Sequence, residues 1–196
     1  VLNENEDVEI IEPYHTTFAN QIIEEFMLVT NMAVAEKYYF LELPFIYRIH
    51  EKPDEEKLRD LNSILANYKL RIKGIKDVHP KALSDILNGI ENSEDKDIIS
   101  TYMLRSLKLA KYSNECLGHF GLNAKYYCHF TSPIRRYPDL FIHRIISKTL
   151  ENKLMFKDNE IAKLEKQAEK YSKSSSEIEK DATKIERDFD SLYSTL

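Results

Sequence analysis

The residues best suited to chemistry gather in the stretch from 119 to 148. This stretch holds five basic residues against the single acid Asp139, whereas the whole chain has a formal net charge of −5. It also contains three of the six histidines and a group of closely spaced aromatic rings. Because cations bind phosphates and ring faces stack on bases, this composition favours a site for single-stranded nucleic acid. The basic residues are Lys125, Arg135, Arg136, Arg144 and Lys148.

A helix that begins at Ser132 would add an anion-binding site to this stretch. Ser132 is a preferred N-cap residue and Pro133 suits the first helical position, so we expect a helix from 133 to about 150. Free backbone N–H groups in its first turn and the guanidinium of Arg135 would then meet at one phosphate. The alternative is that Arg135 and its neighbour lie on a solvated helix face and that Asp139 pairs with one of them.

Other side chains of this stretch would either bind or only support the fold. Asp139 and His143 are four residues apart, which would allow a ligand pair on one helix face. We expect instead that Asp139 makes a structural hydrogen bond that fixes Arg135. We expect His119 to be structural as well. Tyr127 and the tyrosine before it would either stack on bases or pack in the core, and packing is the more common fate of such a cluster.

Helices must position most of these residues, because only four glycines and six prolines interrupt the chain. Apolar residues recur at helical spacing between Phe18 and Phe40, and they alternate as in a short strand between Phe45 and His50. The other elements that we expect are helices at about 54–68, 80–91, 93–112, 133–150 and 158–196, and short strands at 8–11 and within 115–131.

This pattern predicts an α+β fold that is mostly helical and has a few short strands. The long helix at 158–196 has eight basic and nine acidic residues between 157 and 188, which is typical of a solvated helix face. The serine run at 172–176 allows a break in it. We expect the main core to come from the helical regions at 18–40, 80–112 and 133–150.

Length and composition set further limits. The 196 residues suffice for one domain, and no apolar run approaches the roughly 20 residues that span a bilayer. No secretory signal is visible at the start, and Cys116 and Cys128 are too few for a disulfide framework or a zinc site. We therefore expect two small buried cysteines in a cytoplasmic protein. Because Val1 stands where an initiator methionine would, we expect a piece of a longer polypeptide.

One long signature resembles that of the ribonuclease II family, which includes the ribonuclease R type of 3′→5′ exoribonuclease. It comprises His119-Phe-Gly-Leu and then Tyr127-Cys-His-Phe-Thr-Ser-Pro-Ile-Arg-Arg-Tyr-Pro-Asp-Leu-Phe-Ile-His143-Arg144. Shorter similarities lie at 10–13, 22–28, 47–53 and 186–188, so the resemblance covers most of 8–192.

The resemblance implies that residues 1–196 are the C-terminal part of an RNB catalytic domain. The family hydrolyses single-stranded RNA processively from the 3′ end to nucleoside 5′-monophosphates, with paired magnesium ions. Its metal ligands form an aspartate cluster, Asp-x5-Asp-x-Asp-Asp, which this chain lacks. We expect that cluster upstream and assign no metal to Asp188 or Asp190. The partner would be single-stranded RNA, with no membrane contact, and the full-length enzyme would be a monomer.

Two site residues follow from the resemblance. Arg135 matches the arginine that contacts the scissile-end phosphate, and Glu186 matches a closing-helix glutamate near the RNA path. The rival hypothesis is an RNA-binding or scaffold member of the family that has lost catalysis; a helical interaction module with a chance match is a more distant one. The full set of expected site residues is Arg135 as catalytic; Arg135, Arg136, Ser132, Tyr127 and Glu186 as RNA-binding; and Asp139, His143 and His119 as supporting.

Overall fold

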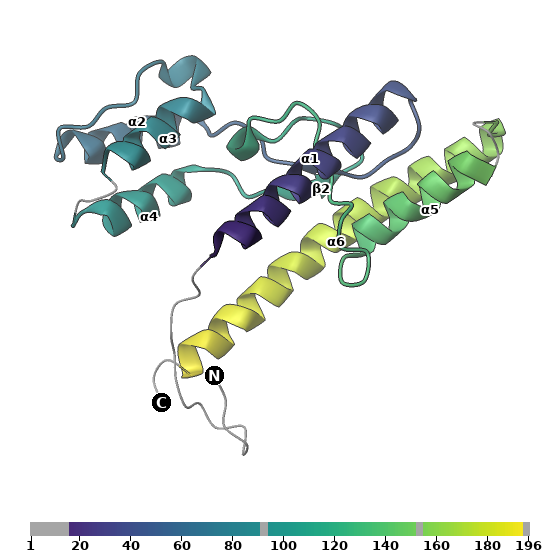
Figure 1. Cartoon of the computed structure of the whole chain (residues 1–196). Helices are drawn as coiled ribbons and strands as arrows, with labels where there is room; N and C mark the ends of the chain where they lie inside the picture. Colours follow the sequence, from purple (N-terminus) through teal and green to yellow (C-terminus); the bar gives the residue numbers. More distant parts are fainter. Residues whose placement is uncertain (1–15, 91–93, 152–154, 194–196) are drawn as a thin grey trace.

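A computed structural model describes residues 16–90, 94–151 and 155–193 (Figure 1). The helices within these ranges are α1 (Phe18–Phe40), α2 (Glu55–Ala66), α3 (Pro80–Gly89), α4 (Lys96–Ser106), α5 (Tyr137–Glu151) and α6 (Asp158–Tyr193). Two short strands, β1 (Tyr47–Ile49) and β2 (Lys111–Ser113), pair antiparallel, and 3₁₀ turns lie at Ile75–Asp77 and Phe120–Leu122. The expected α+β, mostly helical fold class is thereby confirmed.

The helix that the periodicity predicted at 18–40 has the predicted bounds. It begins with a capping box, in which the Thr17 hydroxyl accepts from the Asn20 backbone N–H at 3.3 Å. In return, the Thr17 backbone N–H donates to Asn20 Oδ1 at 3.0 Å. The helix ends at Leu41, where the chain turns through Glu42 at a left-handed φ of 52°. The start of this helix is therefore specified by local sequence.

The core is divided in two, which corrects the expectation of one core from 18–40, 80–112 and 133–150. One cluster joins α1, β1, α5 and α6, and includes Ile46, Ile142 and Ala168. The other joins α2, α3 and α4, and includes Leu65 and Met103. The α3–α4 region packs on α2 because both present complementary apolar faces, while α6 fills the place beside α5 (Figure 1).

The sheet lies directly on α6. The Tyr112 backbone N–H of β2 donates to Ser176 Oγ at 2.9 Å. The serine run does not break the helix. The Ser172 and Ser176 hydroxyls point back along it and donate to the carbonyls of Glu169 and Ser172, at 3.0 and 2.9 Å. Small hydroxyl side chains at these positions let the strand approach the helix backbone.

Several expected boundaries were wrong. The helix expected at 93–112 ends at Ser106, and the strand expected after 115 lies earlier, at Lys111–Ser113. The strand expected at 8–11 lies outside the described residues. Among the helices that the structure describes, none combines the length and apolar character that crossing a membrane requires.

Candidate functional site

The signature loop from 114 to 136 is tied to the strands by backbone hydrogen bonds. The Arg48 N–H of β1 donates to the Tyr127 carbonyl at 3.0 Å. Beyond the strand, the His50 N–H donates to the Gly118 carbonyl at 3.0 Å, and the Phe120 N–H donates to the His50 carbonyl at 2.7 Å. A loop anchored in this way can hold functional side chains in fixed positions.

Asn31 of α1 makes three hydrogen bonds to the same loop. It is only 3% exposed, and its side chain donates to the Tyr127 hydroxyl at 3.2 Å. Its Oδ1 accepts from the Phe130 backbone N–H at 3.0 Å, and its carbonyl accepts from Cys128 Sγ at 3.3 Å. The sequence analysis missed this residue. The available signal was an amide on the same helical row as the buried Ala35 and Tyr38.

The turn from 132 to 136 differs from the predicted helix start. Helix α5 begins at Tyr137, so Ser132 is not its N-cap and Pro133 is not its first residue. Instead the Ser132 carbonyl accepts from the backbone N–H groups of Arg135 and Arg136, at 3.3 and 3.1 Å. The Ser132 N–H is also occupied, since it donates to Asp139 Oδ1 at 2.8 Å. The predicted phosphate site of helix N–H groups is therefore not formed at this position.

Asp139 fixes Arg136, which corrects the expectation that it fixes Arg135. The Asp139 carboxylate is fully buried and accepts from Arg136 Nε at 2.9 Å and Nη2 at 2.8 Å. This bidentate geometry holds the guanidinium in one orientation. The pairing of Asp139 with one of the two arginines is thereby confirmed, whereas the solvated helix face expected with it is not, because both arginines precede α5 and Arg136 is half-buried.

Arg135 is exposed and takes part in none of the ion pairs formed by the described residues. Its positive charge adds to the lowering of the His129 pKa, after burial and the charges of Arg136 and Arg48. The turn thus presents one anchored arginine and one arginine whose charge is available to an anion.

The imidazole of His129, which precedes these arginines in the loop, is neutral at neutral pH. Burial lowers the pKa of His129 to about 3, with further lowering by the charges of Arg136 and Arg48. His129 Nδ1 is hydrogen-bonded to the Tyr112 hydroxyl at 2.9 Å, and burial raises the pKa of that phenol to about 12. The Arg48 guanidinium lies 4.7 Å from the centre of the Tyr112 ring. At neutral pH the cationic charge here therefore comes from arginines and not from histidines.

His119 and Tyr127 are placed to support the loop. Burial lowers the pKa of His119 to about 4, and its Nδ1 accepts from the Leu122 N–H at 3.2 Å. The Tyr127 ring is buried and packs edge-on against His119, with centroids 5.2 Å apart. With its hydroxyl bonded to Asn31, Tyr127 has the position that the packing alternative describes. A direct Tyr127 contact with RNA stays a prediction.

His143 does not pair with Asp139, so the conceivable ligand pair is not formed. Its Nε2 is 3.0 Å from the Phe130 carbonyl, and its ring is stacked on Phe130 at a centroid distance of 4.2 Å. Among the described residues no group of three or more His, Cys, Asp or Glu side chains could hold a metal ion. The role of His143 is thus to support the backbone before the arginine turn.

Glu186 lies elsewhere, exposed on the C-terminal half of α6. The ion pairs formed by the described residues do not include it, so the predicted pairing with a neighbouring lysine or arginine is not seen there. Its expected place near an RNA path stays a prediction. The structure brings Ser132, Arg136 and Asp139 together, and it leaves Glu186 on another element.

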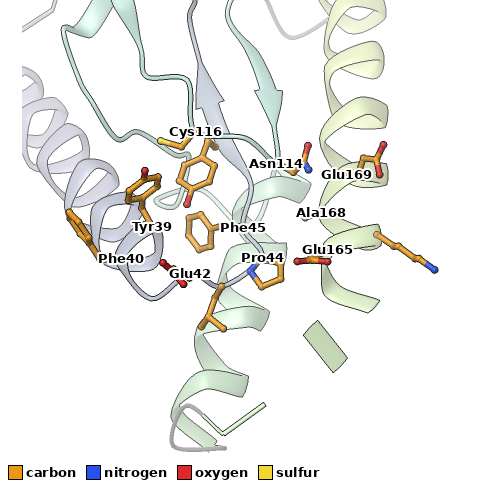
Figure 2. A pocket seen from close by; sticks show the side chains of 13 residues that line it. Tyr39, Phe40, Glu42, Pro44, Phe45, Asn114, Cys116, Glu165, Ala168 and Glu169 are labelled. Carbon is orange, nitrogen blue, oxygen red and sulfur yellow. The ribbon is translucent and has the colours of Figure 1, made fainter. Parts of the chain in front are cut away.

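A hollow of about 780 Å³ lies where the end of α1 and the following loop face α6 (Figure 2). Glu42, Glu165 and Glu169 line it, against the single cation Lys166. Figure 2 shows Glu165 and Glu169 on the α6 side and Tyr39 on the α1 side. Three carboxylates make this hollow unsuited to a phosphate polymer, in contrast to the arginine turn.

Comparisons with known proteins agree with the signature. The family model for the RNB domain matches residues 1–152. Ribonuclease R of Thermotoga maritima is 40% identical over 166 residues, which are 85% of this chain and 23% of that protein. The chain therefore spans about a quarter of that relative's length.

Solved structures share the fold. Mycoplasma genitalium RNase R in complex with ribose-methylated single-stranded RNA superposes with a TM-score of 0.92 at 29% identity, covering 100% of this chain and 31% of that one. Yeast Ssd1, a pseudonuclease, superposes with a TM-score of 0.66 at 22% identity over 83% of this chain and 20% of that one, which shows a common fold alone. On the strength of the domain match and these relatives, the chain belongs to the RNB domain family, together with the ribonuclease R proteins.

Proposed function

We propose that this chain is the RNA-holding, C-terminal part of the RNB catalytic domain of a 3′→5′ exoribonuclease. Such an enzyme hydrolyses single-stranded RNA processively to nucleoside 5′-monophosphates. The observation that carries the proposal is the arginine turn, in which the buried Asp139 carboxylate pairs with the partly buried Arg136 and anchors the loop that presents Arg135. Arg135, an exposed cation on an anchored turn without an ion-pair partner among the described residues, is suited to a phosphate.

Within this proposal Arg135 contacts the phosphate at the scissile end. Its guanidinium would stabilise the negative charge that develops on the phosphate oxygens during hydrolysis. Arg136 would add positive field from a fixed position, because Asp139 occupies only part of its guanidinium. The neutral His129 and His119 leave proton transfer to groups outside the described loop.

Magnesium is the metal of the proposed reaction class. Among the described residues, no three His, Cys, Asp or Glu side chains are grouped as a metal site of that kind would require. The proposal therefore assigns the ligands to an aspartate segment that this sequence does not contain, and no catalytic step is derived through the metal.

A second candidate is an RNA-binding member of the family without catalysis. The similarity of fold to a pseudonuclease is the observation that favours it. The two candidates differ in the preceding segment of the protein: an intact Asp-x5-Asp-x-Asp-Asp cluster indicates an enzyme, and substituted aspartates indicate a binder. The arginine turn serves RNA binding in both.

The direct test uses the 196-residue chain, 3′-labelled single-stranded RNA and magnesium. We expect binding without release of nucleoside monophosphates. Release above a no-protein control would show that the active site lies within this chain. Failure to bind RNA at low salt would reject the proposed RNA-holding role, since electrostatic binding is strongest under that condition.

A further inference from the structure

A second groove, distinct from the arginine turn, runs between the C-terminal half of α6, β2 and the start of α2. Its volume is about 850 Å³. In Figure 1 this half of α6 (yellow) extends past the end of α5, which covers only the other half. Two acids line the groove, Glu179 and Asp188. Seven cationic residues line it as well: Arg48, Lys57, Lys108, Lys111, Lys180, Lys184 and Arg187.

The C-terminal half of α6 contributes more cations than acids to this groove. Lys180, Lys184 and Arg187 line it, and their spacing of four and three residues places them on one helical row. Glu179 and Asp188 of the same helix also line the groove, whereas the exposed acids Glu177, Asp181 and Glu186 do not. The positive charge of the groove therefore comes from the lining residues of α6 together with Arg48, Lys57, Lys108 and Lys111.

Part of this positive charge is not neutralised by the described residues. Ion pairs join Arg48 to Glu179, Lys108 to Asp54 and Lys111 to Glu51. Those pairs fix the groove wall beside β1 and β2. The other four lining cations take part in none of the ion pairs that the described residues form: Lys57, Lys180, Lys184 and Arg187. Unpaired cations along one groove are the electrostatic pattern that an extended polyanion fits.

The groove is connected to the arginine turn through side chains in contact. Arg48 lines the groove and lies 4.7 Å from the centre of the Tyr112 ring. The Tyr112 hydroxyl is hydrogen-bonded at 2.9 Å to His129, whose pKa is lowered by the charge of Arg136. Neighbouring side chains thus lead from the groove toward the turn, and along this path Arg48 and Arg136 are ion-paired and His129 is neutral.

We propose that this basic groove binds the sugar–phosphate backbone of the RNA strand whose end reaches Arg135. The inference rests on the proposed function and adds a second contact region to it. Lysines and an arginine would bind successive phosphates, and the exposed Leu109 side chain on the rim offers an apolar surface to a base or sugar. The four lining cations without an ion pair among the described residues, together with the RNA-holding role proposed for the same chain, favour an RNA strand over an acidic protein segment.

The test replaces three groove cations together, as Lys180→Gln, Lys184→Gln and Arg187→Gln. The matched control replaces three exposed cations in the other half of α6, as Lys163→Gln, Lys166→Gln and Lys170→Gln, so that the net charge falls equally. Affinity is measured against salt for single-stranded RNAs of about 4 and about 16 nucleotides, lengths that bracket common binding sites.

We expect the groove variant to bind the longer RNA at least about tenfold more weakly and to lose about 2 from the slope of log affinity against log salt, as for three phosphate contacts. The shorter RNA should bind all three proteins alike. An unchanged slope in the groove variant, or an equal loss in the control, would overturn the proposal.

Two further comparisons show whether a negative result rejects only the groove or also the proposed function. If Arg135→Ala weakens binding and the groove variant does not, the groove is wrong and the RNA-holding role stands. If no protein binds either RNA, the proposed function itself fails. Polyglutamate that competes for the groove more strongly than RNA would identify an acidic protein as the occupant and would also overturn the proposal.

Discussion

Asp139 and Arg136 form a bidentate pair at the base of the turn that presents Arg135. The Asp139 carboxylate is fully buried, and its two oxygens accept from Arg136 Nε and Nη2 at 2.9 and 2.8 Å. The same carboxylate accepts the Ser132 N–H at 2.8 Å, so it closes the turn at both ends. The position of Arg135 therefore depends on a residue that would not itself touch RNA.

Asp139→Asn should destabilise the chain by about 3 kcal/mol, because breaking such a pair leaves a partly buried guanidinium without its partner. Urea unfolding measures the free energy difference. The control is Asp181→Asn, an exposed acid on α6, which should change stability by less than about 0.5 kcal/mol. Equal stability of the Asp139 variant and the wild type would show that the pair does not hold the turn.

Asn31→Ala should cost about 1–3 kcal/mol, since the partly buried Phe130 N–H and the buried Tyr127 hydroxyl each lose a partner. RNA affinity should fall as well, because the loop before the arginine turn loses its attachment to α1. Thermal unfolding and RNA titration of the same variant check both effects. Asn88→Ala, a substitution at an exposed position of α3, is the control. If Asn88→Ala lowered the stability as much as Asn31→Ala does, the claim that Asn31 holds the loop would be contradicted.

Acid should destabilise the fold through His129. Its folded pKa, about 3, lies below the unfolded value of about 6.5, so the unfolded chain binds the proton first. The stability from neutral His129 is complete above about pH 6.5 and is lost as the pH falls toward 3, by at most about 1.4 kcal/mol per pH unit.

Replacing His129 measures how much of the acid-induced loss of stability comes from this residue. His129→Gln should flatten the loss of unfolding free energy between about pH 6.5 and 5. A pH profile of the His129 variant that matches the wild type would contradict a neutral, buried imidazole at this position.

Glu186→Ala should tighten RNA binding or change turnover if this carboxylate lies near the RNA path, because its removal relieves repulsion from phosphates. Affinity and degradation rate are measured separately at fixed salt. Glu177→Ala, another exposed acid in the same half of α6, is the control. If both quantities stay unchanged for Glu186→Ala, the residue belongs to the solvated face of the helix.

Local sequence predicted those parts of the fold that local interactions decide. The helix at Phe18–Phe40 follows from apolar spacing and its Thr17 capping box, and the strand at Tyr47–Ile49 from alternation. The turn at Ser132 was misjudged because Asp139, seven residues later, takes the Ser132 N–H and delays the helix to Tyr137. A partner across the turn thus outweighed a preferred N-cap.

The candidate site, like the fold, was predictable only where residues close in sequence decide it. The signature singled out Arg135 and Asp139, but spacing alone did not decide which arginine Asp139 binds, and from the first turn of α5 it binds Arg136. Asn31 was missed because its partners Tyr127 and Phe130 are nearly a hundred residues away in sequence. The basic groove was missed for the same reason, since α2, β2 and α6 meet only in the folded chain.

The most direct test of the central claim is the rate of RNA hydrolysis when Arg135 is changed in a protein that joins this chain to the aspartate segment. We expect Arg135→Ala to lower the single-turnover rate by roughly 10²–10³ while RNA affinity changes much less. Arg135→Lys should rescue little, because an ammonium lacks the guanidinium fork. Arg105→Ala, at an exposed position on α4, should leave the rate unchanged. Wild-type rates for both Arg135 variants would contradict the account.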